Sequence, residues 1–228
     1  MMDAIQKSRL QEVAGLDALP VVAYNIRANG KSAARNTTAN IDIETKLDKP
    51  GIDIFIHQGT KKESVNIPVE LSESGMKDMV YNDFYIGAGS DVVIIAGCGI
   101  HNCGTGDSQH DGIHTFHVGQ NAKVRYVEKH YGEGDGRGKR VMNPTTIVYL
   151  EEGAKLEMEM TQISGIDVTL RKTSAKLKAG SSLVIREKVM TTGEQKAVSD
   201  ITADLDGEGC SCNVVSRTVA KDKSTQHF

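Results

Sequence analysis

One short strand pattern recurs along this chain at a nearly constant interval, and it constrains the fold more than any other feature. A glycine or asparagine is followed by a small residue, one further residue, and then alternating apolar positions. The pattern starts at positions spaced 32, 32, 27 and 29 residues apart, namely Gly89, Asn121, Gly153, Gly180 and Gly209. Recurrence of one strand unit at such a period is typical of a solenoid, in which each repeat stacks on the next.

Between these positions the chain alternates between apolar and polar residues, as in "NAKVRYVEKH" and "KLEMEMTQ". No helical period of useful length appears between residues 35 and 220. Tryptophan is absent and there are 23 glycines, which fits many short strands joined by glycine turns. Two or three strands per repeat predict an all-β parallel β-helix. A β-sandwich is the alternative, although it gives no reason for a repeat.

The N-terminal residues differ from the rest. Residues 3 to 14 predict a short helix with Ile5, Leu10 and Val13 as its apolar positions, ended by Pro20. We therefore divide the chain into an N-terminal helical segment, residues 1–20, and a β-helix core, residues 21–228. The first residues lack the apolar core of a signal peptide, and no stretch approaches the roughly 20 apolar residues that span a bilayer. We expect a cytoplasmic protein that does not enter a membrane.

Charge and cysteine content exclude two further classes. The 27 basic and 30 acidic residues give a net charge of −3, which argues against a dominant nucleic-acid-binding surface. Four cysteines in 228 residues are too few for a disulfide scaffold, so we expect reduced thiols. Cys210 and Cys212 lie two residues apart in a predicted strand, a poor spacing for a disulfide bond, and we interpret them as small core thiols.

The stretch "GCGIHNCGTGDSQHDGIHTFH", residues 97–117, contains two cysteines and four histidines, which are typical ligands of zinc and iron. Its candidate ligands are Cys98, Cys103, His101, His110 and His114. Strand alternation places His114 and His117 on opposite faces, and the established zinc spacings are absent. The alternative interpretation is a glycine-rich turn with buried cysteines and hydrogen-bonded histidines.

Three polar residues share strand parity with apolar neighbours and are predicted to face the interior of the β-helix. Glu128 and His130 follow the alternation of Val124 and Tyr126, while Gln162 follows Leu156, Met158 and Met160. A buried polar group needs a hydrogen-bond partner, so we expect either an internal polar ladder or a functional group here.

The segment "HYGEGDGRGKRVMNP" fails as a phosphate-binding loop, because Glu133 and Arg140 occupy positions that require glycine and serine or threonine. We interpret it as a flexible, exposed turn and expect no nucleotide to bind this chain.

Long segments carry a resemblance to a known family: "HDGIHTFHVGQNAKVRYVEKHYGEGDGRGKRVMNPTT", then "VYLEEGAKLEMEMTQISGIDVTLRKTSAKLKAGSSLVIREKVMT" and "SRTVAKDKS". Over about residues 20–228 the chain resembles the SufB/SufD family, in particular its short SufB-like members. The resemblance implies a right-handed parallel β-helix that acts as a scaffold in SUF iron–sulfur cluster assembly. It implies a transiently held iron–sulfur cluster, the SufC ATPase as a partner, and pairing with a second copy or a SufB/SufD-like paralogue.

Two details of the resemblance concern individual positions. Thr161 and Gln162 match interior family positions at which polar groups help to move sulfur along the core. The chain stops at "AKDKSTQHF", where the family continues with a cluster-associated cysteine and the helical region that docks SufC. We therefore expect a core truncated at its C-terminus, without the SufC docking region.

The resulting expectation is an assembly scaffold without enzymatic turnover, with ATPase activity only in the SufC partner. One rival is a β-helix or cupin-like metalloenzyme that uses the stretch from Cys98 to His117. A second rival is a purely structural β-solenoid, such as a carbohydrate-binding module. Because the open ends of a β-helix expose strand edges, we also expect self-association.

Overall fold

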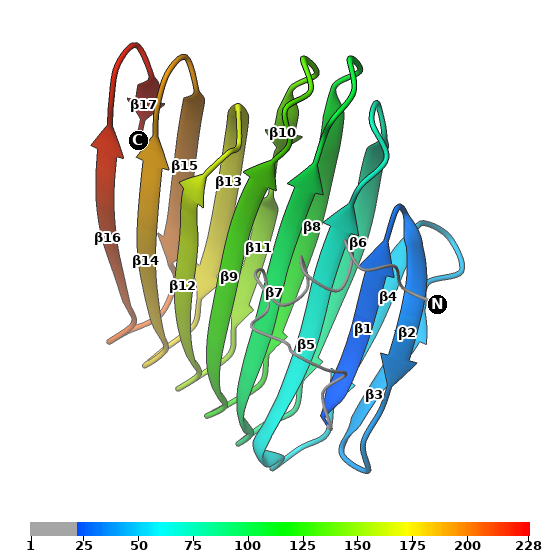
Figure 1. The fold of residues 1–228 in the computed structure, drawn as a ribbon. Helices are drawn as coiled ribbons and strands as arrows, with labels where there is room; N and C mark the ends of the chain where they lie inside the picture. Colours follow the sequence, from blue (N-terminus) through cyan, green and yellow to red (C-terminus); the bar gives the residue numbers. More distant parts are fainter. Residues whose placement is uncertain (1–21) are drawn as a thin grey trace.

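The computed structural model describes residues 22–228, which form a flattened coil of two facing sheets (Figure 1). Within these residues the structure is all-β, contains no helix, and confirms the predicted parallel β-solenoid. The right-handed sense of the coil stays a prediction. The helix predicted over residues 3 to 14 lies outside the described residues.

The first sheet, sheet A, has the strand order β16-β14-β12-β9-β7-β5-β1-β2. Its strands are β1 (Ala23–Ala28), β2 (Lys31–Asn36), β5 (Lys61–Leu71), β7 (Asp91–His101), β9 (Lys123–Glu133), β12 (Lys155–Ser164), β14 (Ser182–Thr191) and β16 (Ser211–Ala220).

The second sheet, sheet B, has the order β17-β15-β13-β10-β8-β6-β4-β3, and β11 pairs with both β13 and β8. Its strands are β3 (Ile41–Thr45), β4 (Gly51–Ile56), β6 (Lys77–Ile86), β8 (Ser108–Val118), β10 (Arg140–Met142), β11 (Thr145–Leu150), β13 (Val168–Leu177), β15 (Lys196–Leu205) and β17 (Thr225–His227).

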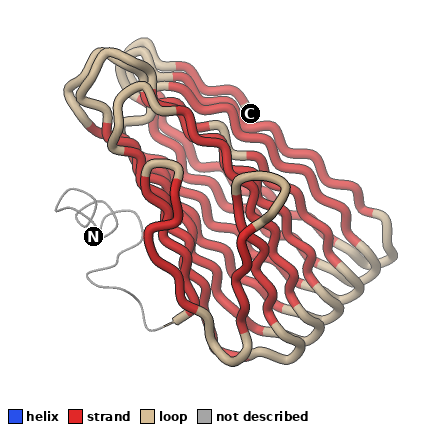
Figure 2. The backbone as a smooth tube through the Cα atoms, turned by 90° about the vertical axis from the view of Figure 1, so that its right-hand side faces the viewer, coloured by secondary structure: helices blue, strands red, loops and turns tan. Residues whose placement is uncertain are grey.

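From β4 and β5 onward each strand pairs in parallel with the strand one coil later, so the chain alternates between the two sheets. At the N-terminal end, β1–β2 and β3–β4 pair antiparallel instead. Figure 2 shows the consequence, with connecting loops stacked in columns at both margins of the sheets. The two antiparallel pairs end the regular coil on this side.

The recurring glycine or asparagine forms one of these columns of turns. Gly89, Asn121, Gly153, Gly180 and Gly209 all have a positive φ, between 56° and 70°. Glycine and asparagine adopt this left-handed conformation more readily than other residues, which explains why the repeat begins with them. Each turn also bonds to the next, as when the Gly89 amide donates to the carbonyl of Gln120 at 2.8 Å.

The loops at the opposite margin correct one prediction. The whole segment 130–144 was predicted to be a flexible, exposed turn, but its first residues end β9 and Arg140–Met142 form β10. The loop at this margin therefore comprises only residues 134–139, and it stacks on the loop of the preceding coil. The Gly136 amide donates to the Asn102 carbonyl at 3.1 Å and the Gly138 amide to the Gly104 carbonyl at 3.0 Å. A Cβ atom on Gly138 would lie 2.0 Å from the Gly106 oxygen. These glycines therefore serve close backbone stacking.

The interior contains two apolar clusters. The larger includes Ile54, Phe84, Phe116 and Tyr126, all fully buried. The smaller consists of Val69, Leu71, Cys98, Ile100, Met142 and Ile166. Buried polar side chains occupy the register positions where the two clusters meet, since Ala96 and Cys98 pair in register with Glu128 and His130. This polar layer contains most of the residues considered next.

Candidate functional site

Glu128, His130 and Gln162 face the interior, as their parity predicted. Their exposed fractions are 3%, 6% and 4%. Glu128 and His130 lie on β9, and Gln162 lies beside His130 on β12. Because these strands alternate apolar and polar side chains, the same parity that buries Val124 and Tyr126 also carries the polar groups inward.

Arg171 on β13 connects these side chains from the opposite sheet. Its Nη1 donates to Glu128 Oε2 at 2.7 Å, and its Nη2 lies 3.3 Å from His130 Nδ1. Its Nε lies 3.7 Å from Glu187 Oε1 on β14. The Arg171 side chain is only 5% exposed. A buried cation of this kind is tolerated because Glu128 accepts its hydrogen bond and the carboxylate of Glu187 lies close to it.

The network continues from Glu128 toward the N-terminal coils. The Tyr126 hydroxyl donates to Glu128 Oε1 at 2.8 Å, and His114 Nδ1 lies 2.8 Å from the same hydroxyl. Since the hydroxyl proton is already donated, His114 Nδ1 is the donor in this contact. His114 Nε2 then accepts from the Asn82 amide at 3.3 Å. His114 is therefore a neutral imidazole with both ring nitrogens used.

Burial and charge set the protonation states of this layer. Burial lowers the pKa of His114 to about 4 and also lowers the pKa of His130. Burial alone would raise the pKa of Glu128, but His130 and Arg171 outweigh it and hold that pKa well below its usual range. At neutral pH the layer thus contains an ionised Glu128 beside a charged Arg171, with neutral histidines around them.

The remaining members extend the network toward the C-terminal coils. Glu187 accepts hydrogen bonds from Ser199 at 2.7 Å and from Ser216 at 2.8 Å. Gln162 accepts one from the Thr169 hydroxyl at 3.0 Å. Side chains joined by hydrogen bonds, and by the ion pair of Arg171 with Glu187, therefore run along the interior from β6 to β16, across several coils.

Cys98 lies at the edge of this layer and is buried, with 2% exposure. It lines a cavity of about 10 Å³, together with His110, His114, Glu128 and His130. Such a volume has room for about one water molecule. Burial, with the negative charges of Glu70, Asp78 and Glu128 nearby, raises the pKa of the Cys98 thiol well above its usual value. The resting group is the neutral thiol.

His110 is held by a separate contact with a carboxylate. Its Nδ1 lies 3.1 Å from Asp78 Oδ2, and Asp78 also accepts from Arg27 at 2.6 Å. Burial would raise the pKa of Asp78, yet His110 and Arg27 lower it well below its usual range. Asp78 therefore engages His110 through Nδ1, while the Nε2 atoms of His110 and His114 both face Gly112, 3.2 and 3.5 Å from where its Cβ would be.

The stretch 97–117 is divided between two environments. Gly97 to His101 end strand β7 and Ser108 to Val118 form β8, so only residues 102–107 form a turn. Cys98, His110 and His114 point inward, whereas Cys103 is exposed on the loop beside His101. The structure thus does not bring the five candidate ligands together. Among residues 22–228, no group of three or more His, Cys, Asp or Glu side chains is arranged to hold a metal ion.

Outside the coil, His101 and Cys103 meet a carboxylate. Cys103 Sγ lies 3.0 Å from His101 Nε2, and His101 Nδ1 lies 3.2 Å from Glu133 Oε1. The Tyr131 hydroxyl donates to Glu133 Oε2 at 2.8 Å. His101 stands between the thiol and the carboxylate and uses one ring nitrogen for each. The arrangement is therefore a line of proton donors and acceptors, unlike the convergence of ligands on one ion.

The four cysteines lie far apart. Cys210 and Cys212 are half-buried at the C-terminal end of the coil, where they pack against the larger apolar cluster. Four strand steps separate β16 from β7, so Cys212 and Cys98 are at least roughly 19 Å apart. The four thiols of one chain cannot surround one cluster.

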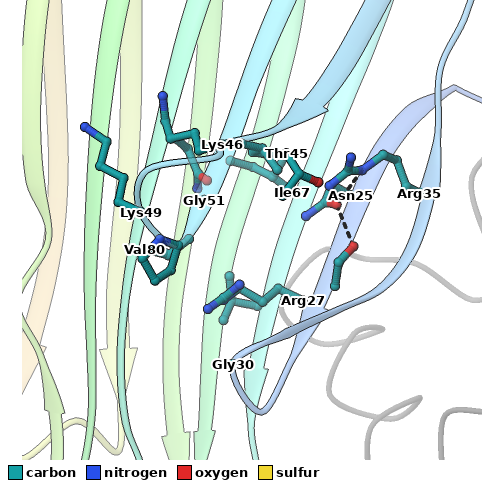
Figure 3. A pocket seen from close by; sticks show the side chains of 15 residues that line it. Asn25, Arg27, Gly30, Arg35, Thr45, Lys46, Lys49, Gly51, Ile67 and Val80 are labelled. Atoms are coloured by element: carbon teal, nitrogen blue, oxygen red, sulfur yellow. Dashed lines mark hydrogen bonds between the residues drawn. The ribbon is translucent and has the colours of Figure 1, made fainter.

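A cavity of about 200 Å³ lies at the N-terminal end, between the β1–β2 hairpin and the segment that joins β3 to β4. Figure 3 shows Arg35 reaching Asn25 on one side of it, with Lys46 and Lys49 on the other. Its described lining contains four cations and no carboxylate, although Arg27 pairs with Asp78, and Lys46 with Asp53 and Asp83, outside the lining. Asn82 also lines this cavity and contacts His114, so the cavity adjoins the interior network.

An aromatic ladder marks the outer face of sheet B. Phe55, Tyr85, His117 and Tyr149 stack in sequence, with ring centroids 5.0, 5.0 and 5.2 Å apart and nearly parallel planes. They border an open groove of about 400 Å³. Because the rings cover one another's faces, the ladder presents mainly ring edges to solvent.

Sequence reasoning missed several of these groups. Arg171 shares the inward parity of Thr173 and Ala175, a signal that could have identified it. A charged residue in a half-buried strand is ordinarily assigned to the solvent face, and for this reason Arg171 was not identified as an interior residue. Glu187 and Asp78 were missed for the same reason.

Two comparisons with known proteins complete the description. Residues 77–228 match the family model described as "SUF system FeS cluster assembly, SufBD core domain". The match covers well over half of the chain and includes strands β6 to β17 with the interior polar layer. A comparison with curated proteins found no match.

Among the described residues no helix is long and apolar enough to cross a membrane.

Proposed function

This chain belongs to the SufBD core domain family of the SUF iron–sulfur cluster assembly system, and on that premise we propose that it is a scaffold that works with the SufC ATPase. It presents sulfur and iron to one another while its partner hydrolyses ATP, and it has no turnover of its own. The cluster is cargo in this proposal, held transiently and then passed on.

The observation that carries the proposal is the polar layer inside the family-matched coils. Apolar packing alone would stabilise a solenoid, and a buried network of charges is costly unless every member is paired. Here Glu128, His130 and Arg171 are paired, and the layer also contains the thiol of Cys98 and the thioether of Met160, whose sulfur lies 3.0 Å from Arg171 Nη1. Sulfur-bearing and polar groups thus share one interior layer.

We assign the handling of sulfur within the core to Cys98, Glu128, His130 and Gln162. Cys98 faces a cavity with the imidazoles of His110 and His130 in its wall. The raised pKa of its thiol keeps it unreactive at rest. An incoming iron ion would stabilise the thiolate, because a metal ligand must be deprotonated and metal binding releases its proton.

The spread of the cysteines supports a shared cluster site. Since the four thiols cannot surround one cluster, this chain would supply some of its ligands and a partner the rest. A second copy of the chain or a SufB/SufD-like paralogue would provide them, with SufC bound to the assembly. The choice between a SufB-like and a SufD-like role depends on which partner is used.

Anaerobic reconstitution with iron and sulfide tests the proposal, read by visible absorbance and by iron content per chain. The chain should be purified alone and together with SufC. We expect SufC to co-purify and a cluster to form in the complex. The variant Cys98→Ser should lower the iron content by at least about half, because it removes the interior thiol.

The matched control is Cys212→Ser, which removes a half-buried thiol at the far end of the coil. This variant should retain the wild-type iron content. If SufC does not bind and no cluster forms in any mixture, the scaffold proposal fails and a purely structural solenoid remains. If Cys98→Ser and Cys212→Ser behave alike, the assignment to Cys98 fails.

The two rivals make different predictions in the same experiment. A metalloenzyme would retain a stoichiometric metal after purification without reconstitution, although its candidate ligands are divided between the interior and the outer loop. A carbohydrate-binding solenoid would need aromatic faces on which sugars can stack, whereas the ladder of Tyr85, His117 and Tyr149 has its faces covered.

A further inference from the structure

The cavity at the N-terminal end of the coil is bordered by the inner face of the β1–β2 hairpin. Asn25 on β1 pairs in register with Arg35 on β2, and residues paired in this way lie beside one another on the same face of a sheet. Figure 3 shows the two side chains on the same side of the cavity. The hairpin therefore presents an amide and a guanidinium together to this space.

The hydrogen bonds of Asn25 leave its amide nitrogen as an unused donor. Asn25 Oδ1 accepts from Ser32 Oγ at 2.8 Å and from Arg35 Nε at 3.0 Å. Because a guanidinium can only donate, the atom that faces it must be the amide oxygen. Asn25 Nδ2 donates to none of residues 22–228, although the residue is only 6% exposed. Asn25 lines the cavity, so an occupant of the cavity can accept from this nitrogen.

Two of the four cations in the lining are already neutralised by the protein. Arg27 donates to both oxygens of Asp78, at 3.1 and 2.6 Å. Lys46 pairs with Asp53 and Asp83. These four ion-paired contacts fix the positions of the two side chains and cancel most of their charge in the cavity.

The other two cations, Arg35 and Lys49, pair with no carboxylate among residues 22–228. Arg35 donates only to neutral acceptors, the Asn25 amide oxygen and, at 3.4 Å, the carbonyl of Ile43. The Lys49 ammonium lies over the ring of Tyr81, 4.6 Å from its centroid. A guanidinium that is oriented by neutral groups keeps its full charge for an anion.

The remaining wall of the cavity is apolar. Ile52, Ile67 and Val80 contribute to it and are 4%, 3% and 2% exposed. The volume of about 200 Å³ is below the roughly 300–1,000 Å³ of pockets that enclose drug-sized ligands. An occupant that fits both walls is therefore small, with an anionic group at one end and a short apolar body at the other.

We propose that this cavity binds a small organic carboxylate, with Arg35 and the amide of Asn25 as donors to its oxygens. The planar fork of a guanidinium matches the two oxygens of a carboxylate. A phosphate ion carries more charge than the one guanidinium without a carboxylate partner compensates, and it has no apolar surface to set against Ile52 and Val80. The site lies before the residues that match the family model, and it adds a ligand to the proposed scaffold function.

The test uses the full 228-residue chain at neutral pH and constant ionic strength, without iron and without SufC. The probe is butyrate, and its comparisons are butyramide, which has the same shape without the charge, and inorganic phosphate. Titration followed by nuclear magnetic resonance measures each affinity. We expect saturable binding of butyrate and at least about tenfold weaker binding of the other two, since a hydrogen bond to a charged group contributes about that factor.

Thermal unfolding provides a second measurement. A ligand that binds only the folded chain raises the midpoint of unfolding as its concentration increases. We expect this rise with butyrate, whereas butyramide at the same concentrations should leave the midpoint nearly unchanged.

The variant Asn25→Asp tests the site with little change of shape. Its carboxylate still accepts from Ser32 and Arg35, but a negative charge replaces the unused amide donor. We expect butyrate binding to be lost, while the midpoint of unfolding without ligand stays at or above that of the wild type, because Arg35 gains an ion pair.

Arg35→Gln removes the guanidinium and should weaken butyrate binding by at least about tenfold. The matched control is Arg125→Gln, which removes an exposed guanidinium paired with Glu159 at 3.1 Å on the outer face of sheet A. This variant should retain the wild-type affinity.

Four results would overturn the proposal: no saturable binding of butyrate, equal affinities for butyrate and butyramide, tighter binding of phosphate than of butyrate, or wild-type affinity in Asn25→Asp. Because iron and SufC are absent from the test, each of these leaves the scaffold proposal standing. Failure of SufC binding or of cluster formation would likewise leave the affinity for butyrate unaffected.

Discussion

Arg171 is the residue on which the interior layer depends most. It contacts Glu128, His130 and Glu187 from the opposite sheet, and its side chain is 5% exposed. Removing one partner of a buried ion pair costs about 3–5 kcal/mol, because the other charge is left without compensation. An exposed pair such as Arg125 with Glu159 contributes far less. Removing Arg171 would therefore leave the charges of Glu128 and Glu187 buried without a compensating cation.

His114 makes the stability of the molecule depend on pH. Its pKa of about 4 in the folded chain lies below the ordinary value of 6.5, because the charged form is unfavourable when buried. The unfolded chain therefore binds a proton that the folded chain does not, between these two values. We expect the free energy of unfolding to fall by about 2 kcal/mol between about pH 7.5 and pH 5 from this residue. Urea denaturation at a series of pH values measures it.

His130 contributes in the same direction, since burial lowers its pKa as well. The variant His114→Asn should therefore reduce the slope of stability against pH without abolishing it. Asn82→Ala is the control, because it removes the partner of His114 Nε2 and leaves the titrating group in place. An unchanged slope in His114→Asn would show that this histidine does not titrate as inferred.

Strand parity alone was sufficient to place Glu128, His130 and Gln162 inside the coil. The repeat contained more: His101 and Glu133 are 32 residues apart, the same interval as Gly89 and Asn121, so their pairing was implicit in the period. Contacts between the two sheets follow no such interval. Arg171 and Glu128 are 43 positions apart, and their meeting depends on how the sheets face one another.

Among the elements, the turns carry the regularity of the fold. The column from Gly89 to Gly209 was evident in the sequence, and the same turn occurs one coil earlier at Gly59, with a φ of 76°. The antiparallel pairs β1–β2 and β3–β4 precede the first recognised repeat and were not predicted. They interrupt the period, and nothing in their alternation distinguishes antiparallel from parallel pairing.

Two glycines allow the strain of a left-handed backbone conformation to be measured apart from the clash of an added Cβ with the neighbouring coil. Gly165 and Gly193 have φ values of 73° and 61°, so alanine is strained at both. At Gly165 an added Cβ would lie 1.6 Å from the Gly132 oxygen, while at Gly193 nothing lies within 4 Å. We expect Gly193→Ala to lower the free energy of unfolding by about 1–2 kcal/mol and Gly165→Ala by at least about 3 kcal/mol.

Urea denaturation of the two variants, with the wild type alongside, provides the comparison. The difference between them isolates backbone stacking between coils, because both positions require the same left-handed conformation. Equal losses of stability would contradict the tight packing of this loop on the preceding coil.

At the scale of the whole molecule, the two ends of the coil are unlike. The antiparallel pairs cover the N-terminal end, whereas β16 is the last strand of sheet A in the described chain. On the last coil, Leu205 is 56% exposed and Val214 is 43% exposed. An uncovered strand edge beside exposed apolar side chains invites pairing with another edge.

We expect the purified 228-residue chain to self-associate through this end. Small-angle scattering across a concentration series should show the apparent mass rising above that of one chain. Val214→Arg should shift the chain toward the monomer, because it places a charge on the exposed end. Asn213→Arg, on the neighbouring outward position, is the control and should leave association unchanged. A monodisperse monomer at every concentration would contradict the expectation.

Parallel stacking also has a mechanical consequence. Each coil is joined to the rest by ladders of hydrogen bonds to its two neighbours, and every 27 to 32 residues the same unit returns. A force that draws the ends apart therefore loads the coils in series. The terminal coil has a neighbour on only one side, so it yields first and releases roughly 100 Å of slack chain. The next coil is then the terminal one and unfolds in its turn. The molecule therefore lengthens in nearly equal steps.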